Sequence, residues 1–273
     1  MDREKHSIFC QIRSHSHFFE PGVFEMLERP SCHINVYDVK EDTFFLGIHS
    51  EHSPPNSRAD FNEAGTFILS EFLIALNVGS MGHFEWAAKT AAPPTYSLFN
   101  KDTRSAVGLA SARHYKYPEK KSPLTNEDLG RAVVVFEGLC NEPNNYVRTE
   151  YLKGIYHLGL EFFDLTFRKD AFANFYRAFE HFVTDRVLRV AKLTNELKQM
   201  AEAMRQVGLP ESMVGAFGPD LYRLRCEQVM HSQKQQVEIT WEDAAKMKAY
   251  ADTMMLAFYF PPWAKASRGG LKK

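Results

Sequence analysis

The chain has 273 residues, with 33 Lys and Arg against 34 Asp and Glu, so its formal net charge is −1. Hydrophobic residues make up 44% of it and charged residues 25%, a composition that excludes intrinsic disorder, collagen and a coiled coil. The balanced charge argues against a general binder of polyanions, although it is compatible with a local basic cleft.

The sequence predicts neither a membrane anchor nor a secretory signal. The best apolar run, residues 67–78, is shorter than the roughly 18 residues that a membrane helix needs, and Ser70 and Glu71 interrupt it. Residues 1–6 are mostly charged and lead into no long apolar segment. No CxxC spacing occurs among the cysteines, which are Cys10, Cys32, Cys140 and Cys226. We therefore expect a cytoplasmic protein with reduced thiols and no membrane partner.

The first half of the chain predicts short strands and one helix. Residues 34–39 alternate apolar and polar side chains, and residues 43–49 are the expected partner strand across a polar turn. Apolar residues at helical spacing predict a helix over 64–78. Two further strands are expected at 83–88 and 96–99.

The second half predicts a series of helices. Thr125 or Asn126 is the expected N-cap of the first, and Thr240 with Asp243 resembles a capping box at the start of the last. Pro219 fits the first turn of the predicted helix over 220–231. The predicted helices are, in chain order, 126–140, 146–167, 170–190, 193–207, 220–231 and 241–260.

We therefore expect an α+β protein with two domains. The polar, proline-containing segment 117–125 is the predicted linker, although a loop inside one domain would fit the same composition. The expected units are a strand-rich N-terminal domain over residues 1–122, a mainly α-helical domain over 123–262 and a basic tail over 263–273.

Arg225 and His231 carry the clearest chemistry. Arginine offers a permanent positive charge and a planar fork for a phosphate, and histidine can transfer a proton near neutral pH. Metal-free RNA cleavage needs both: while the ribose 2′-oxygen attacks the adjacent phosphate, an acid or base moves protons and a cation stabilises the developing charge. A solvated arginine and a histidine near a helix C-terminus would give the same pair.

The spacing of this pair limits how it can act. Six steps of about 100° place the two side chains roughly 120° apart on a regular helix. A shared site would need Arg225 to reach round, the helix to unwind near His231, or a second subunit to complete it. Glu227 lies four residues before His231 on the same face and can orient the imidazole, or it can be part of a surface pair.

At these residues the chain resembles the HEPN superfamily, most nearly its Apea-like branch, over about residues 126–260. Three features carry the resemblance: a long helix pair with an Ala-Leu-Glu-like stretch, an arginine and a histidine within the family's Arg-x4–6-His spacing, and a polar loop before a capped helix. The helix pair is 151–167 and 170–190, and its Ala-Leu-Glu-like stretch is Arg177-Ala178-Phe179-Glu180-His181-Phe182. The arginine and histidine form Arg225-x5-His231, and the polar loop leads to Thr240.

The resemblance implies a helical bundle that forms a homodimer and cleaves RNA without a metal or other cofactor. In this family such endoribonucleases serve as toxins or antiphage defence effectors, which implies an RNA substrate and an antitoxin or sensor partner. Carried over, Arg225 would stabilise the scissile phosphate, His231 would transfer the proton, and Glu180 would match an acid of the second helix. Strand-rich N-terminal regions also occur in similar proteins.

One departure keeps a second hypothesis open. Cys226 follows the motif arginine, where the family commonly has Asn, Asp or His. Cysteine usually packs as a small apolar side chain and is a weak hydrogen-bonding group. Some members of the family are inactive, so the alternative is a non-catalytic dimerisation or binding module whose N-terminal domain senses a ligand or partner.

Other patterns have simpler interpretations beside the functional ones. Arg186, Arg189 and Lys192 recur every three residues and could guide RNA phosphates, or they could form a solvated helix face. A third hypothesis places a small-molecule or metal-dependent enzyme in residues 1–125. The metal-capable side chains of this region lack zinc spacing, so we expect no metal. The histidines and cysteines in question are His6, Cys10, His15, His17, Cys32, His33, His49 and His52.

Overall fold

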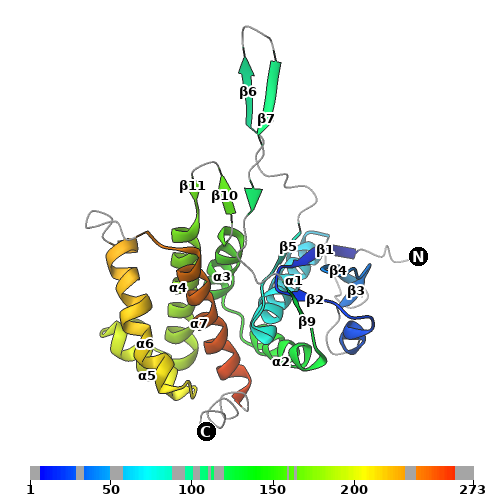
Figure 1. Ribbon diagram of the computed structural model, residues 1–273. Helices are drawn as coiled ribbons and strands as arrows, with labels where there is room; N and C mark the ends of the chain where they lie inside the picture. Colours follow the sequence, from blue (N-terminus) through cyan, green and yellow to red (C-terminus); the bar gives the residue numbers. More distant parts are fainter. Residues whose placement is uncertain are drawn as a thin grey trace.

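The computed structural model places the N-terminal four-stranded sheet with the first two helices and packs the later helices beside them, while the hairpin strands at 96–100 and 105–109 project away (Figure 1). The described residues are 7–28, 34–49, 58–87, 96–100, 105–109, 112–113, 120–158, 160–162, 165–230 and 238–261. Among them, no helix has the length and apolar character required to cross a membrane.

The N-terminal sheet has four antiparallel strands, in the order β3 (Asn35–Tyr37), β4 (Thr43–His49), β1 (Ser7–Ser14) and β5 (Phe84–Trp86). Ile12 of the central strand β1 lies opposite Phe44 of β4 and Trp86 of β5. Ile12 and Phe44 are fully buried, whereas Phe9 is 53% exposed. One face of the sheet therefore packs on the core and the other faces outward.

The elements expected in the first half are confirmed, but several others were not predicted, among them the short helix η1 (Val23–Glu28) and the central strand of the sheet. The predicted strands match β3, β4, β5 and β6 (Tyr96–Asn100), and the predicted helix over 64–78 is the centre of α1 (Arg58–Ser80). The central strand β1 was not predicted. Its signal was the alternation of Ile8, Cys10 and Ile12, which Phe9 obscures because it is apolar on the outward face.

Several short strands connect these elements to the helices. They pair as a parallel β2–β9 ladder, a β6–β7 hairpin and a three-stranded β11–β10–β8 sheet. Their bounds are β2 (His17–Phe18), β7 (Ser105–Leu109), β8 (Ala112–Arg113), β9 (Ser122–Pro123), β10 (Leu160–Phe162) and β11 (Leu165–Thr166).

The helical half follows the expected order. Thr125 and Thr240 are N-caps, each in a capping box that an aspartate three residues later completes, so both predicted starts are confirmed. The helices are α2 (Asn126–Asn141), α3 (Asn145–His157), α4 (Arg168–Phe182), α5 (Glu196–Gln206), α6 (Glu211–Phe217) and α7 (Trp241–Tyr259). The short helix α6 was not predicted.

The predicted helix over 146–167 is wrong in its second half. α3 ends at His157, and its C-cap Leu158 has an extended backbone with φ −65° and ψ 118°. Residues 160–162 then pair with β8 and β11. A short apolar run such as this one fits a strand and a buried helix equally well, so periodicity could not decide between them.

Two other predicted helices are partly π-helical. The helix over 170–190 divides into α4 and the π-helix η2 (Val183–Leu188). The helix over 220–231 divides into η3 (Gly218–Tyr222) and η4 (Arg225–Met230). Because π-helical hydrogen bonds join residues five apart, the 100° step of a regular α-helix does not apply between Arg225 and the residues that follow it.

The two halves share buried surface. α1 packs along α2, α7 packs on α4 and also contacts α1 and α2, and buried side chains of all these helices belong to one hydrophobic cluster. Phe172, Phe175 and Phe179 of α4 are at most 1% exposed, which confirms them as core residues. The tail over 263–273 lies outside the described residues, and the division at 122/123 stays a prediction.

The contact between α1 and α2 is close enough to require glycine. A Cβ at Gly79 would come within 2.6 Å of the Ala132 Cα, whereas a Cβ at Gly130 would meet nothing within 4 Å. We expect Gly79→Ala to lower the free energy of unfolding by about 2–3 kcal/mol, because the helix backbones must separate. Gly130→Ala, the matched control, should raise it by about 0.5–1 kcal/mol. Urea denaturation measures both, and equal effects would contradict the close approach.

Candidate functional site

The guanidinium of Arg225 lies between a carboxylate and an aromatic ring. Its Nη1 is 3.1 Å from Oε2 of Glu196, and its Cζ is 5.3 Å from the ring centre of Tyr176. The side chains of Arg225 and Glu196 are 19% and 18% exposed, so this ion pair lies at the edge of the protein interior. α4 provides the tyrosine, α5 the glutamate and η4 the arginine.

Glu196 also accepts hydrogen bonds from two phenols. The hydroxyl of Tyr176 donates to its Oε1 at 3.0 Å, and that of Tyr222, in η3, donates to its Oε2 at 3.5 Å. Tyr176 is 2% exposed, and its hydroxyl lies 3.3 Å from the sulfur of Met200. One carboxylate thus receives a guanidinium and two hydroxyl groups from three different elements.

Glu180 belongs to the same environment. It lies one turn after Tyr176 on α4, and burial raises the pKa of its carboxyl group. The negative charge of Glu196 raises this pKa further, while Arg225 lowers it. Such a carboxyl group holds its proton closer to neutral pH than an exposed glutamate does. Arg225 and Glu180 are thus close enough to influence each other electrostatically, and their role as site residues stays a prediction.

The other two predicted catalytic positions are not in this cluster. His231 lies outside the described residues. Glu227 has a 49% exposed side chain and faces Arg223, with 4.0 Å between its Oε2 and the arginine Nε. A pair of this kind, four residues apart on an exposed helix, contributes little to stability.

The three basic residues expected to contact RNA have different surroundings. Arg186 is bound to Glu142, with 2.7 Å between its Nη1 and the glutamate Oε2, and its side chain is 16% exposed. Arg189 is exposed and ends η2 in a left-handed conformation, with φ 52°. Lys192 is exposed in the segment before α5. Arg189 and Lys192 are thus more accessible to a ligand than Arg186.

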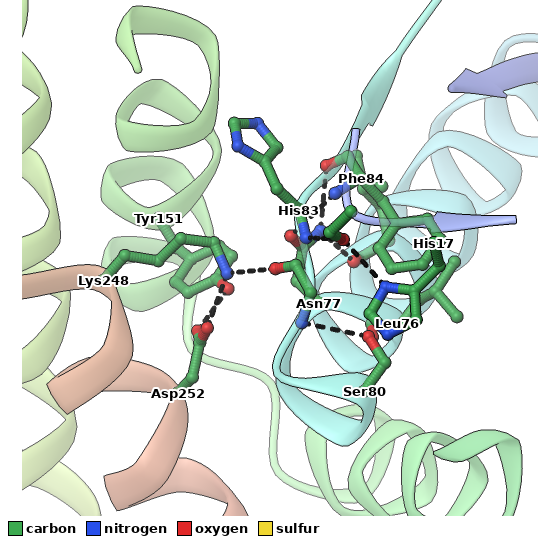
Figure 2. Close-up of polar contacts among 12 residues, drawn as sticks. His17, Leu76, Asn77, Ser80, His83, Phe84, Tyr151, Lys248 and Asp252 are labelled. Atoms are coloured by element: carbon green, nitrogen blue, oxygen red, sulfur yellow. Dashed lines mark hydrogen bonds and ion pairs between the residues drawn. The ribbon is translucent and has the colours of Figure 1, made fainter. Parts of the chain in front are cut away.

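A second polar cluster is fully enclosed where the two halves meet (Figure 2). Lys248 and Asp252 lie one turn apart on α7, and 2.5 Å separates Lys248 Nζ from an Asp252 oxygen. Tyr151 of α3 donates to Asp252, and Lys248 donates to the Gly82 carbonyl at 2.6 Å. Burial lowers the pKa of Lys248 and raises that of Asp252, and each partner opposes the shift of the other.

The Gly82 carbonyl is positioned by the side chains at the end of α1. Asn77 donates to the carbonyls of Leu73 and Phe84, both at 2.9 Å, and accepts from the Phe84 amide at 3.0 Å. Ser80 accepts from the Gly82 amide at 3.1 Å. These bonds fix the turn that Lys248 reaches across from the helical half, so the cluster joins the halves rather than opening to a ligand.

The N-terminal histidines show structural contacts. His15 Nε2 lies 2.9 Å from Glu85 Oε1, and His17 stacks on Phe84 with its pKa lowered, chiefly by burial. Within the part of the chain that the structure describes, no three His, Cys, Asp or Glu side chains are arranged to hold a metal ion. The positions that fall outside the described residues are His6, Cys32, His33 and His52.

A cavity of about 700 Å³ lies between α1 and α3, and sequence reasoning did not predict it. Its lining includes Asp60, Glu63, Ser70 and Arg148. Arg148 also contacts Glu71, with 3.4 Å between its Nη1 and the glutamate Oε1. Burial raises the pKa of Glu71 to about 7, although Arg148 opposes the shift.

Comparison of the chain with protein-family models, with curated proteins and with solved structures gave no match.

The buried ion pair yields a stability prediction. Lys248→Met leaves the Asp252 charge buried without its cation, so we expect a loss of about 3–5 kcal/mol in the free energy of unfolding. The double variant Lys248→Met/Asp252→Asn leaves no buried charge and should recover most of this loss. Lys246→Met is the control, because Lys246 is 45% exposed on the same helix. Chemical denaturation decides: equal losses in the single and double variants would rule out an uncompensated charge.

Glu71 yields a pH prediction. Its pKa is about 7 in the folded protein against an ordinary 4.5, so folding favours the protonated form. Its stabilising contribution is complete below pH 4.5 and disappears as the pH rises through 7. Wild type should therefore lose up to about 3 kcal/mol relative to Glu71→Gln between pH 4.5 and pH 8. Glu63→Gln, on the exposed side of α1, should follow wild type in the same thermal unfolding series.

Proposed function

We propose that the protein is a metal-independent endoribonuclease of the HEPN type. The observation that carries the proposal is that η4 packs on α4, where the positive charge of Arg225 acts on the partly buried carboxyl group of Glu180. The resemblance identified these two positions separately, in segments far apart in the sequence. Their proximity is what a site assembled from the second helix and the Arg/His motif requires.

The reaction needs no group beyond those of the protein and the RNA. The ribose 2′-oxygen attacks the adjacent phosphorus and loses its proton, while the bond to the 5′-oxygen breaks and that oxygen takes up a proton. The products are a 2′,3′-cyclic phosphate and a 5′-hydroxyl end. Arg225 stabilises the charge on the phosphate oxygens, and His231 transfers the proton. Glu180, with its raised pKa, is a second proton carrier beside the arginine.

The biological setting is part of the same proposal. A cytoplasmic homodimer would place two Arg225/His231 motifs in one cleft, with Arg189 and Lys192 at hand for RNA phosphates. The protein would act as a toxin or antiphage defence effector, inhibited by an antitoxin or activated by a sensor partner. Cys226 and the near-neutral net charge do not add to this proposal, because both favour the non-catalytic alternative.

One observation favours the second candidate, a non-catalytic dimerisation or binding module. The guanidinium of Arg225 already has a carboxylate partner in Glu196, at 3.1 Å. A structural arginine would have this contact without any substrate. The two functions differ in a simple respect, since only the nuclease depends on His231.

The test is RNA digestion in EDTA by wild type, Arg225→Ala and His231→Ala. Each substitution should reduce cleavage by about a hundredfold or more, because each removes charge stabilisation or proton transfer from the transition state. Arg223→Ala is the matched control: Arg223 is 64% exposed and faces Glu227. It should cleave as wild type does. Product ends are identified by their resistance to a phosphatase that requires an open 3′-phosphate.

Three results would overturn the proposal. Equal cleavage by wild type and His231→Ala would point to a contaminant or another site. Cleavage that stops in EDTA would contradict a metal-free mechanism. No cleavage by a folded wild-type dimer, verified by sedimentation and circular dichroism, would favour the binding module.

A further inference from the structure

The surroundings of the Glu196 carboxylate are those of an anion site. The Arg225 guanidinium and the hydroxyls of Tyr176 and Tyr222 converge on it, at 3.1, 3.0 and 3.5 Å. Guanidinium and hydroxyl groups are the donors that proteins use for phosphate oxygens, and the arginine fork suits two of them at once. The same three donors would therefore serve a phosphate in place of the carboxylate.

One donor, Tyr176, is fixed by the core, whereas Glu196 lies at the edge of the interior. Tyr176 is 2% exposed on α4, and its ring lies under the guanidinium of Arg225. Glu196 is the first residue of α5, and the segment before it, which includes Lys192, Thr194 and Asn195, is exposed. Because the Glu196 side chain is 18% exposed, its rotation toward solvent would remove the carboxylate while Tyr176 stays packed in the core.

The neighbouring charges indicate that the group replacing the carboxylate must itself be an anion. Glu180 lies close enough to Glu196 for the negative charge of Glu196 to raise its pKa. Removal of the Glu196 carboxylate would leave Arg225 with less compensating negative charge. A phosphate that arrives there restores the balance of charge around Arg225.

We propose that Arg225, Tyr176 and Tyr222 form a binding site for an RNA phosphate, and that Glu196 occupies this site in the free protein as an internal competitor. The inference rests on the proposed function for the identity of its ligand. It assigns two tyrosines to phosphate binding and an inhibitory role to Glu196.

The experiment measures binding without cleavage. The probe is a fluorescent 2′-O-methyl oligoribonucleotide, which lacks the 2′-hydroxyl that attacks the phosphate, and the readout is anisotropy at fixed salt. Glu196→Gln should bind it about tenfold more tightly than wild type, because the competing charge is gone and the phosphate gains a charge-assisted contact. Glu202→Gln is the matched control, since it makes the same change of charge at an exposed position of α5.

Further variants assign the gain to the site. Arg225→Ala in the Glu196→Gln background should return the affinity to the wild-type value or below, and Tyr222→Phe should remove part of the gain. Glu196→Asp keeps the charge but shortens the side chain, so it should bind with intermediate affinity. Thermal denaturation of each variant confirms that only folded protein is compared.

The proposal would be overturned if Glu196→Gln bound no more tightly than Glu202→Gln, or if its gain persisted without Arg225. The outcome is separate from that of the digestion test. Tighter binding by Glu196→Gln together with uncut RNA would support the anion site and reject the nuclease. Metal-free cleavage by wild type with no gain in Glu196→Gln would support the nuclease and reject the competitor.

Discussion

The buried ion pair of Lys248 and Asp252 is the constraint on which the arrangement of the two halves depends. Charges buried this deeply are stable only when every partner is in place, and here one partner is a backbone carbonyl from the turn after α1. Asn77 and Ser80 fix that turn through their own hydrogen bonds. The pair therefore selects one register of α7 against α1, which an apolar contact of the same size would leave less defined.

The position of α7 also fixes the elements around Arg225, because α7 packs on α4. α7 packs along α4, which carries both Tyr176 and Glu180, and Tyr250 of α7 donates to the Met213 carbonyl of α6 at 2.8 Å. The elements that surround Glu196 are thus held from the side opposite to solvent. Tyr176 is thereby fixed by the core, whereas Arg225 and Glu196 lie at its edge, where a ligand can compete for their contact.

Contacts between residues close in the sequence could be predicted, whereas contacts between distant segments could not. The capping boxes at Thr125 and Thr240 were predictable because all their bonds lie within four residues. Arg225 and Glu180 were found by resemblance, whereas Glu196 was not, since its contacts join elements distant in sequence. Lys248 and Asp252, four residues apart, have the spacing of an ordinary surface pair, so nothing in the sequence signalled their burial.

The π-helical turns that carry Arg225 have a consequence for how this region could have arisen. A π-turn holds one residue more than the α-turn it replaces, and such turns occur mostly at functional sites. Three π-helical segments, η2, η3 and η4, lie in the part of the chain that surrounds α5 and α6. Loss of a single residue from η3, which lies between α6 and Arg225, would restore regular α-helix and turn Arg225 away from Glu196 while Arg225 itself is unchanged. The length of this segment is thus as specific to the site as the identity of its residues.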